Sequence, residues 1–230
     1  MSTFWRRFLL VLGLFGLAGG CNPLMAPFFI FSPEPTFPAE FHPLVAKDKS
    51  QEVRVAILTY MGMETNPELQ HADRELTLLL AGKLQELCAN NGEKVTVINP
   101  LKVEEYKNSH PDWNQQHVEL ETVGRDLRAD YVIYVEINSL SLYQPGTARQ
   151  FYQGKANLTL SLVNTHKPDD FSAPPRELPF SYPTESRGGN IPVDEDMPPH
   201  VFRRNFFEFM ARKLAWQFTA HPTNQHHWCE

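Results

Sequence analysis

The sequence predicts one α/β domain, in which a mixed sheet of about five strands packs against amphipathic helices. Residues 53–60 (VRVAILTY) and 131–137 (YVIYVEI) are near-continuous apolar, β-branched runs, which are typical of strands buried on both faces. Residues 72–89 place leucines on one helical face. In residues 156–163, leucines alternate with polar residues, as in an antiparallel strand with one buried and one solvent-exposed face. Strands that first alternate with helices and then follow one another predict parallel pairing, then antiparallel edges.

Asparagine residues followed by proline indicate where two further helices of the first half begin. Asn66 precedes a proline and is a candidate helix start ahead of the leucine-rich helix. A second strand is expected at residues 94–98. It is followed by Asn99 as an N-cap and Pro100 at the first position of a short helix. A further helix is expected over residues 115–127.

The last third of the chain predicts an edge strand and a long helix. Residues 176–182 read as the edge strand, although they include a proline. Residues 201–218 carry a phenylalanine-rich apolar stripe at helical spacing. Asp194, Glu195 and Asp196 precede this helix and are interpreted as acids that stabilise its positive N-terminus, with cation binding as the alternative.

The charge of the chain limits its partners. The 230 residues have a formal net charge of -6. Residues 1–20 contain Arg6 and Arg7 but no acid, which leaves 19 basic against 27 acidic residues in the rest of the chain. Nucleic-acid binding requires a basic surface, so we expect no nucleic-acid partner. General electrostatic attraction to anionic lipid is disfavoured for the same reason.

Residues 1–21 (MSTFWRRFLLVLGLFGLAGGC) predict a lipoprotein signal. A short basic region precedes an apolar run at 8–17, too short to span a bilayer. Small residues follow, and then Cys21. The segment LAGGC resembles the bacterial lipobox, which implies cleavage before Cys21 and attachment of acyl chains, including palmitate-type chains, to that residue. Several acyl chains anchor a protein firmly.

Two alternatives to the lipid anchor are an ordinary secretory signal with a chance cysteine and an N-terminal membrane helix. Under the lipobox interpretation, the protein faces the periplasm from the cell envelope. Asn22 follows the cysteine instead of aspartate, which favours the outer membrane over the inner one.

These features divide the chain into four parts. Residues 1–20 are the signal peptide. Residues 21–50 are the lipidated cysteine and a proline-rich tether, because repeated prolines exclude helix and interrupt strand pairing. Residues 51–220 are the α/β envelope domain, and residues 221–230 are a flexible tail.

Residues 53–165 resemble a group of envelope proteins. The segment RADYV at 128–132, placed between a helix and a hydrophobic strand, matches their recurring pattern. The group comprises the curli-secretion-channel lipoprotein, the amino-terminal domain of TolB and the lipoprotein activators of penicillin-binding proteins. The resemblance implies a non-catalytic scaffold that binds other envelope components, and it carries over no catalytic residue.

Other candidate chemistry has simpler structural interpretations. His71, Asp73 and Glu75 read as a solvated or capping cluster at a helix start. Glu136 interrupts an apolar strand, and we place it at the open end of that strand. Cys88 reads as a small buried hydrophobe, with a disulfide to Cys229 as the alternative.

The tail offers a metal-site alternative. Its potential ligands for a soft metal are His221, His226, His227 and Cys229. Their spacing matches no standard site, so a flexible tail without metal is the primary interpretation, and no cofactor is expected. We therefore predict a lipid-anchored envelope protein that is not an enzyme and binds an envelope protein. The alternatives are an envelope hydrolase whose residues converge only in the fold, and a metal-binding lipoprotein.

Overall fold

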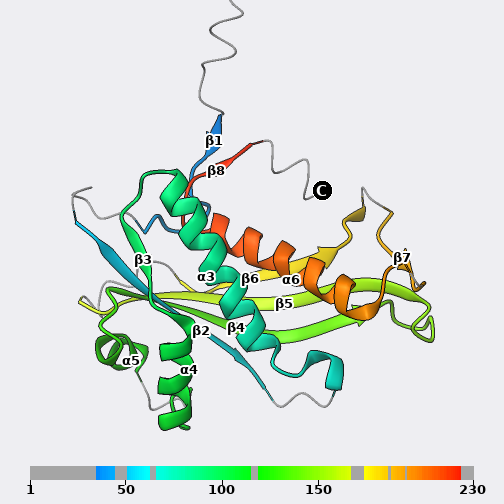
Figure 1. Ribbon diagram of the computed structural model, residues 1–230, viewed down its shortest axis with the longest axis horizontal. Coiled ribbons are helices and arrows are strands. Elements are labelled where there is room, and N and C mark those ends of the chain that lie inside the picture. Colours follow the sequence, from blue (N-terminus) through cyan, green and yellow to red (C-terminus); the bar gives the residue numbers. More distant parts are fainter. Residues whose placement is uncertain are drawn as a thin grey trace, which may run out of the picture. The chain divides into compact units, whose positions relative to one another are not determined.

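The protein was analysed as a computed structural model, shown in Figure 1. Thr36–Glu230 forms one compact unit. The structure describes the following residues: 35–44, 51–62, 66–114, 119–166, 174–185, 188–194 and 196–223.

A six-stranded mixed sheet forms the centre of the unit. Its order is β3-β2-β4-β5-β6, and β7 pairs with β5 beside β6. β2 is parallel to both β3 and β4, whereas β5 is antiparallel to β4, β6 and β7. The strands are β2 (Val53–Met61), β3 (Val95–Val97), β4 (Tyr131–Tyr143), β5 (Phe151–Asn164), β6 (Arg176–Tyr182) and β7 (Ile191–Pro192). The predicted order of parallel and then antiparallel pairing is confirmed, with six strands instead of about five.

The helices lie where the caps and apolar stripes predicted them. Asn66 caps a short 3-10 helix, and Asn99 accepts a hydrogen bond from Leu101 N at the start of the helix that follows β3. The helix expected over 115–127 is shorter than predicted, and residues 115–118 lie outside the described part. The helices are η1 (Pro67–Leu69), α3 (Ala72–Asn90), α4 (Pro100–Ser109), α5 (Leu120–Asp126) and α6 (Pro199–Trp216).

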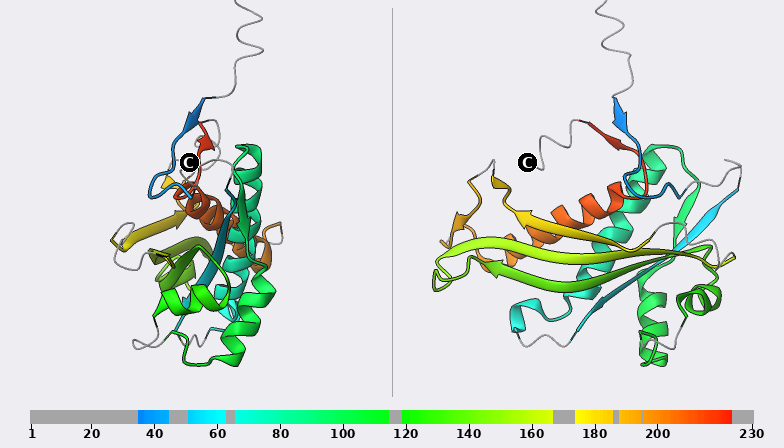
Figure 2. Two further views of the ribbon diagram at one scale, coloured as in Figure 1. Left: turned by 90° about the vertical axis from the view of Figure 1, so that its left-hand side faces the viewer. Right: turned by 180° about the vertical axis from the view of Figure 1, so that it is seen from behind.

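Helices α3 and α6 cover one face of the sheet, and α4 and α5 pack on the other face (Figures 1 and 2). Alternate residues of β2 enter two separate cores because both faces of this strand are buried. Val55 and Ile57 belong to the larger core with α3 and α6. Ala56 and Leu58 belong to the smaller core, with Val103 of α4 and Val123 of α5.

The antiparallel part of the sheet is buried on one face. Leucines 158, 160 and 162 of β5 are buried against the helices, whereas Thr159 and Ser161 of the opposite face are half-buried. Gly154 marks the closest approach of β5 to α6, since an added Cβ would lie 2.7 Å from ring atoms of Phe206. Tyr152 stacks on Phe202 at a ring-centroid distance of 4.5 Å.

Helix α6 begins without the acidic cap that the sequence suggested. Its N-cap residue is Pro198, and the first turn contains no acid. Asp194 Oδ1 instead accepts hydrogen bonds from Asp196 N and Met197 N, at 3.1 and 3.0 Å, and so closes a turn before the helix. The capping prediction is wrong in this respect, because a local turn satisfies Asp194; Glu195 lies outside the described residues.

Two segments from opposite ends of the chain meet at the C-terminus of α6. β1 (Thr36–Phe37) pairs antiparallel with β8 (His221–Pro222). Phe41 N and His42 N both donate to Gln217 O at 2.9 Å, and Leu44 N donates to Phe218 O at 3.2 Å. These bonds satisfy carbonyl groups that the helix end leaves free. Residues assigned to the tether and the tail thus pack on the domain here. Within the described residues, no helix is both long and apolar enough to cross a bilayer.

Candidate functional site

The cluster predicted at the start of α3 is separated by the fold. His71 is exposed and adopts a left-handed backbone conformation with φ 60°. Asp73 forms an ion pair with Lys107 of α4, whereas Glu75 forms one with Arg203 of α6. Because the two acids bind different helices, His71 and its neighbours are not brought together as a catalytic group.

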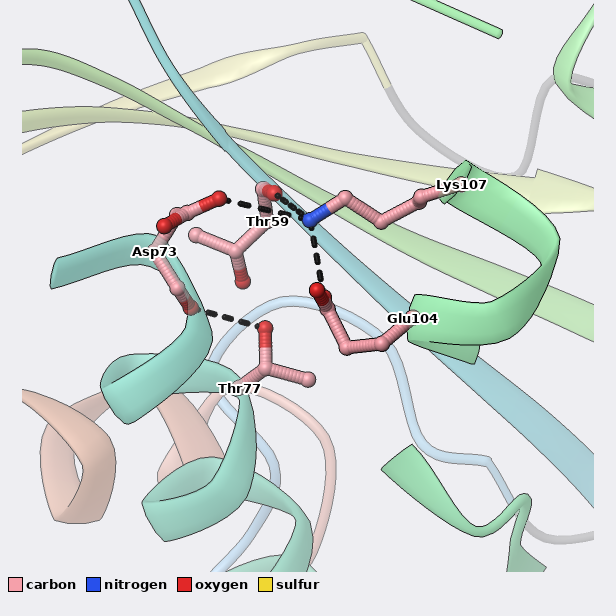
Figure 3. Close-up of polar contacts among 5 residues, drawn as sticks. All are labelled: Thr59, Asp73, Thr77, Glu104 and Lys107. Atoms are coloured by element: carbon pink, nitrogen blue, oxygen red, sulfur yellow. Dashed lines mark hydrogen bonds and ion pairs between the residues drawn. The ribbon is translucent and has the colours of Figure 1, made fainter. Parts of the chain in front are cut away.

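A lysine held between two acids links three elements of the fold (Figure 3). Lys107 Nζ lies 3.3 Å from Asp73 Oδ2 and 2.9 Å from Glu104 Oε1, and it donates to Thr59 O at 3.2 Å. Its side chain is only 10% exposed. The ammonium also lies 5.3 Å from the ring centroid of Trp113. Sequence reasoning missed this cluster, although the Glu104–Lys107 spacing on one helix face was visible.

The geometry of Lys107 favours a structural role. An ammonium group has three N–H donors, and each has an oxygen acceptor here. Thr77 Oγ1 donates to Asp73 O at 2.9 Å and so fixes the start of α3 beneath the ion pair. The cluster therefore fastens α3 and α4 to β2.

Glu136 lies in the middle of β4, not at its open end as predicted. The strand continues to Tyr143, so Glu136 stands between Tyr60 of β2 and Thr159 of β5. The error arose because the polar residues after Ile137 hid the continuation of the strand. Burial, followed by the charge of Glu136, raises the pKa of Tyr134 to about 12.

The antiparallel half of the sheet presents a polar surface, which we call the open face. It is the side opposite α6 of β6, of β5 from Lys155 to Thr159 and of β4 from Glu136 onward (Figure 2, right). On this side the described helices α4 and α5 cover only the start of β4 and the end of β5, where Val132 and Val163 pack in the smaller core. Asn138 Nδ2 donates to Thr159 Oγ1 across the strands at 2.8 Å. The exposed residues of the open face are Asn138, Ser139, Lys155, Glu177, Pro179 and Ser181, and the half-buried ones are Glu136, Ser141, Asn157 and Thr159.

The open face contains a shallow hollow of about 450 Å³. Its lining includes two rows of residues that are paired across neighbouring strands. One row consists of Ser139, Asn157 and Pro179, and the next consists of Lys155 and Ser181. A sheet face of this kind is a rigid platform, because the backbone hydrogen bonds of three strands hold its side chains in register.

β6 is confirmed as an edge strand, and its residues limit what it can bind. Among the described residues, no strand pairs with its outer side. Pro179 at its centre lacks an N–H donor, and Arg176 and Glu177 add charge. Proline and charge on an edge oppose the addition of another strand. The open face is therefore better suited than the edge to hold a partner.

The structure describes some of the predicted cysteine and histidine candidates and not others. Cys88 is a fully buried free thiol. Burial, with a smaller contribution from Glu93, raises its pKa to about 12, so it is a poor nucleophile at neutral pH. Cys21, His226, His227 and Cys229 lie outside the described residues. His221 is buried and stacks on Trp216 at 4.4 Å. The described residues contain no group of three or more potential metal ligands.

No protein-family profile matches the sequence, and no curated protein matches it. The solved chains similar to this one in fold include bacterial lipoproteins. The PelC dodecamer from Paraburkholderia phytofirmans is 10% identical, with a TM-score of 0.38, and the match covers 81% of this chain and 99% of that one. A DUF330-family protein from Xanthomonas campestris is 12% identical, with a TM-score of 0.40 and coverage of 77% and 89%. Lipoprotein GNA1162 from Neisseria meningitidis is 14% identical, with a TM-score of 0.36 and coverage of 57% and 85%. At these values the likeness assigns neither family nor activity.

Proposed function

We propose that this chain is a lipid-anchored protein of the bacterial cell envelope that binds another envelope protein through its open face and performs no catalysis. The observation that carries the proposal is the asymmetry of β4, β5 and β6. Their inner face is buried under α6, whereas their outer face exposes amide, hydroxyl and charged side chains to solvent.

The chemistry of the open face supports binding by contact. Its side chains are held by strand pairing before any partner arrives, so little conformational entropy is lost on association. Hydroxyl and amide groups can donate and accept hydrogen bonds, which gives specificity to a hydrated interface. Attachment to a membrane raises the local concentration of a partner on the same surface, so a weak contact suffices.

The absence of catalysis is proposed from the candidate residues of the sequence and from the lysine cluster found in the structure. Asp73 and Glu75 each hold a cation in a structural ion pair, and Cys88 is buried. Lys107 is surrounded by acceptors. In each case the reactive atom already makes a structural contact or lies in the core.

The lipid anchor rests on Cys21, with the outer membrane favoured over the inner one. Serine has no thiol for a thioether, so Cys21→Ser is expected to leave the protein unprocessed or release it from the membrane. Mass spectrometry of the mature N-terminus checks this directly. An unmodified mature protein that begins at a residue other than Cys21 would contradict the anchor.

Site-specific photo-crosslinking in intact cells tests the binding surface. A photoreactive residue is placed at Lys155 or Ser181 on the open face, and at Arg204 or Arg74 on the helical side as controls; all four positions are exposed. We expect a discrete crosslinked protein from the first pair and not from the second. Equal crosslinking from both pairs, or from the helical side alone, would remove the open face as the binding surface.

A further inference from the structure

We propose that a second site, separate from the open face, binds a phosphate group. It is a hollow of about 410 Å³ between the end of β3, the start of α4 and the end of α5. Arg54, Lys102 and Arg128 line this basic hollow, together with Asn99 and one acid, Asp126. The volume falls within the range of small-ligand sites.

The charge of the basic hollow is opposite to that of the chain. Acidic residues outnumber basic ones in the whole sequence, 27 to 21. The lining of the hollow reverses this ratio, because three cations face a single carboxylate. Asp126 accepts a hydrogen bond from the Tyr106 hydroxyl at 3.2 Å, and Glu52, outside the lining, accepts one from Thr96 at 2.5 Å. Neither hydroxyl is charged, so the excess of positive charge follows from the lining itself, in which three cations stand against one carboxylate.

The three cations also differ from others in the fold by lacking acidic partners. Within the described part of the chain, the side chains of Arg54, Lys102 and Arg128 form no ion pair. By contrast, each of five other cations lies within 4 Å of a carboxylate: Lys83, Lys107, Arg149, Arg203 and Arg204. The guanidinium and ammonium groups of the basic hollow are thus available to an external anion.

Two of these cations occupy positions that are locally unfavourable. Lys102 lies in the first turn of α4, where the helix dipole is positive and no acid is present. Arg128 has φ 58° at the end of α5, a conformation that glycine adopts more easily. A bound anion would offset the repulsion among the three cations and the unfavourable helix position together.

The lining matches phosphate in hydrogen bonding as well as in charge. Guanidinium groups bind phosphate oxygens through paired N–H donors, and lysine adds a point charge. Asn99 Oδ1 accepts from Leu101 N at 2.9 Å, which leaves its amide N–H₂ as a further donor beside the cations. A phosphate dianion would neutralise the net positive charge of the lining. A free phosphate compound and a phospholipid headgroup share this chemistry.

Calorimetric titration of the full-length protein in neutral detergent tests the site, with inorganic phosphate and, separately, phosphatidic acid in mixed micelles as probes. Sodium chloride at matched ionic strength and phosphatidylcholine micelles are the blanks. Arg54→Gln, Lys102→Gln and Arg128→Gly are each expected to weaken binding by about tenfold, because each removes one charge-assisted contact. Arg74→Gln, on an exposed cation outside the lining, should leave the affinity unchanged.

The Arg128→Gly variant separates binding from folding. Glycine suits the left-handed conformation, so the thermal midpoint should stay level or rise while phosphate affinity falls. Binding of inorganic phosphate identifies a soluble ligand, and binding of phosphatidic acid alone identifies a headgroup. Absence of binding to both probes, or equal weakening by Arg74→Gln, would overturn the proposal.

Discussion

The parallel and antiparallel halves of the sheet bury their residues in different ways. β2 lies between β3 and β4, and both of its faces enter hydrophobic cores, one under α3 and one under α4 and α5. β5 lies between β4 and β6, and along most of its length only the face toward α6 is apolar, although Val163 near its end packs in the smaller core. The parallel half therefore buries apolar residues on both faces, which stabilises the fold, whereas the antiparallel half leaves one surface available for contact.

The difference follows from how each half is connected. Parallel strands require crossover helices, and in this fold those helices cover both faces of β2. The antiparallel strands β4 and β5 are joined by a short turn, so no helix is forced onto their outer face. Substitutions should accordingly reduce stability on the covered faces and spare it on the open face.

The largest expected effect is on the covered face of the sheet. Leu80 of α3 is fully buried in the larger core, so Leu80→Ala is expected to lower the free energy of unfolding by about 2–5 kcal/mol. Ser181→Ala on the open face should change it by less than about 0.5 kcal/mol. Urea titration of both variants measures the contrast. Similar losses of unfolding free energy in the two variants would show that substitution destabilises the covered face and the open face equally.

The close approach of β5 to α6 gives a second, smaller effect. Gly154→Ala would place a Cβ against the ring of Phe206, at a cost of about 1–3 kcal/mol. Gly82→Ala on α3 is the matched control, because its Cβ meets nothing within 4 Å. It should stabilise the helix by about 0.5–1 kcal/mol. Thermal unfolding distinguishes the two signs, and a neutral Gly154→Ala would mean that α6 packs less tightly on β5.

The smallest effect concerns the boundary between the halves at high pH. The pKa of Tyr134 is raised to about 12 in the fold, so its neutral form is favoured there. Below the unfolded pKa of about 10 its contribution to stability is complete, and it is lost as pH rises toward 12. Tyr134→Phe should therefore lessen the fall in stability between pH 10 and 12. An unchanged pH dependence would contradict the burial of this hydroxyl.

Local patterns predicted most of the fold. β6 has the predicted bounds, Arg176–Tyr182. Its alternating burial and its flanking turns depend only on residues that are neighbours in the sequence. The start of α4 followed from Asn99 and Pro100 for the same reason. β4 extends beyond the predicted Ile137, since its second half alternates between polar and apolar residues around a bulge. Periodicity is weak where a strand changes from two buried faces to one.

The parts that sequence reasoning missed depend on contacts between distant residues. Lys107 binds Asp73 and Thr59, which are 34 and 48 positions away. The pairing of β1 with β8 joins the two ends of the domain, and it places His221 in the core instead of a tail. The basic hollow likewise gathers Arg54 from β2, Lys102 from α4 and Arg128 from the turn after α5. No local pattern marks such residues before the chain is folded.

The most direct test of the open face as a binding surface is a single charge placed at its centre. Asn157→Arg puts a long cation beside Ser139 and Pro179. Asn205→Arg is the matched control on α6, with the same residue type and the same half-buried class. The yield of the protein crosslinked from position 155 is measured together with the thermal midpoint of each variant. The account predicts that Asn157→Arg abolishes the crosslink at an unchanged midpoint, while Asn205→Arg retains it. An undiminished yield of the crosslinked protein in the Asn157→Arg variant would contradict the account.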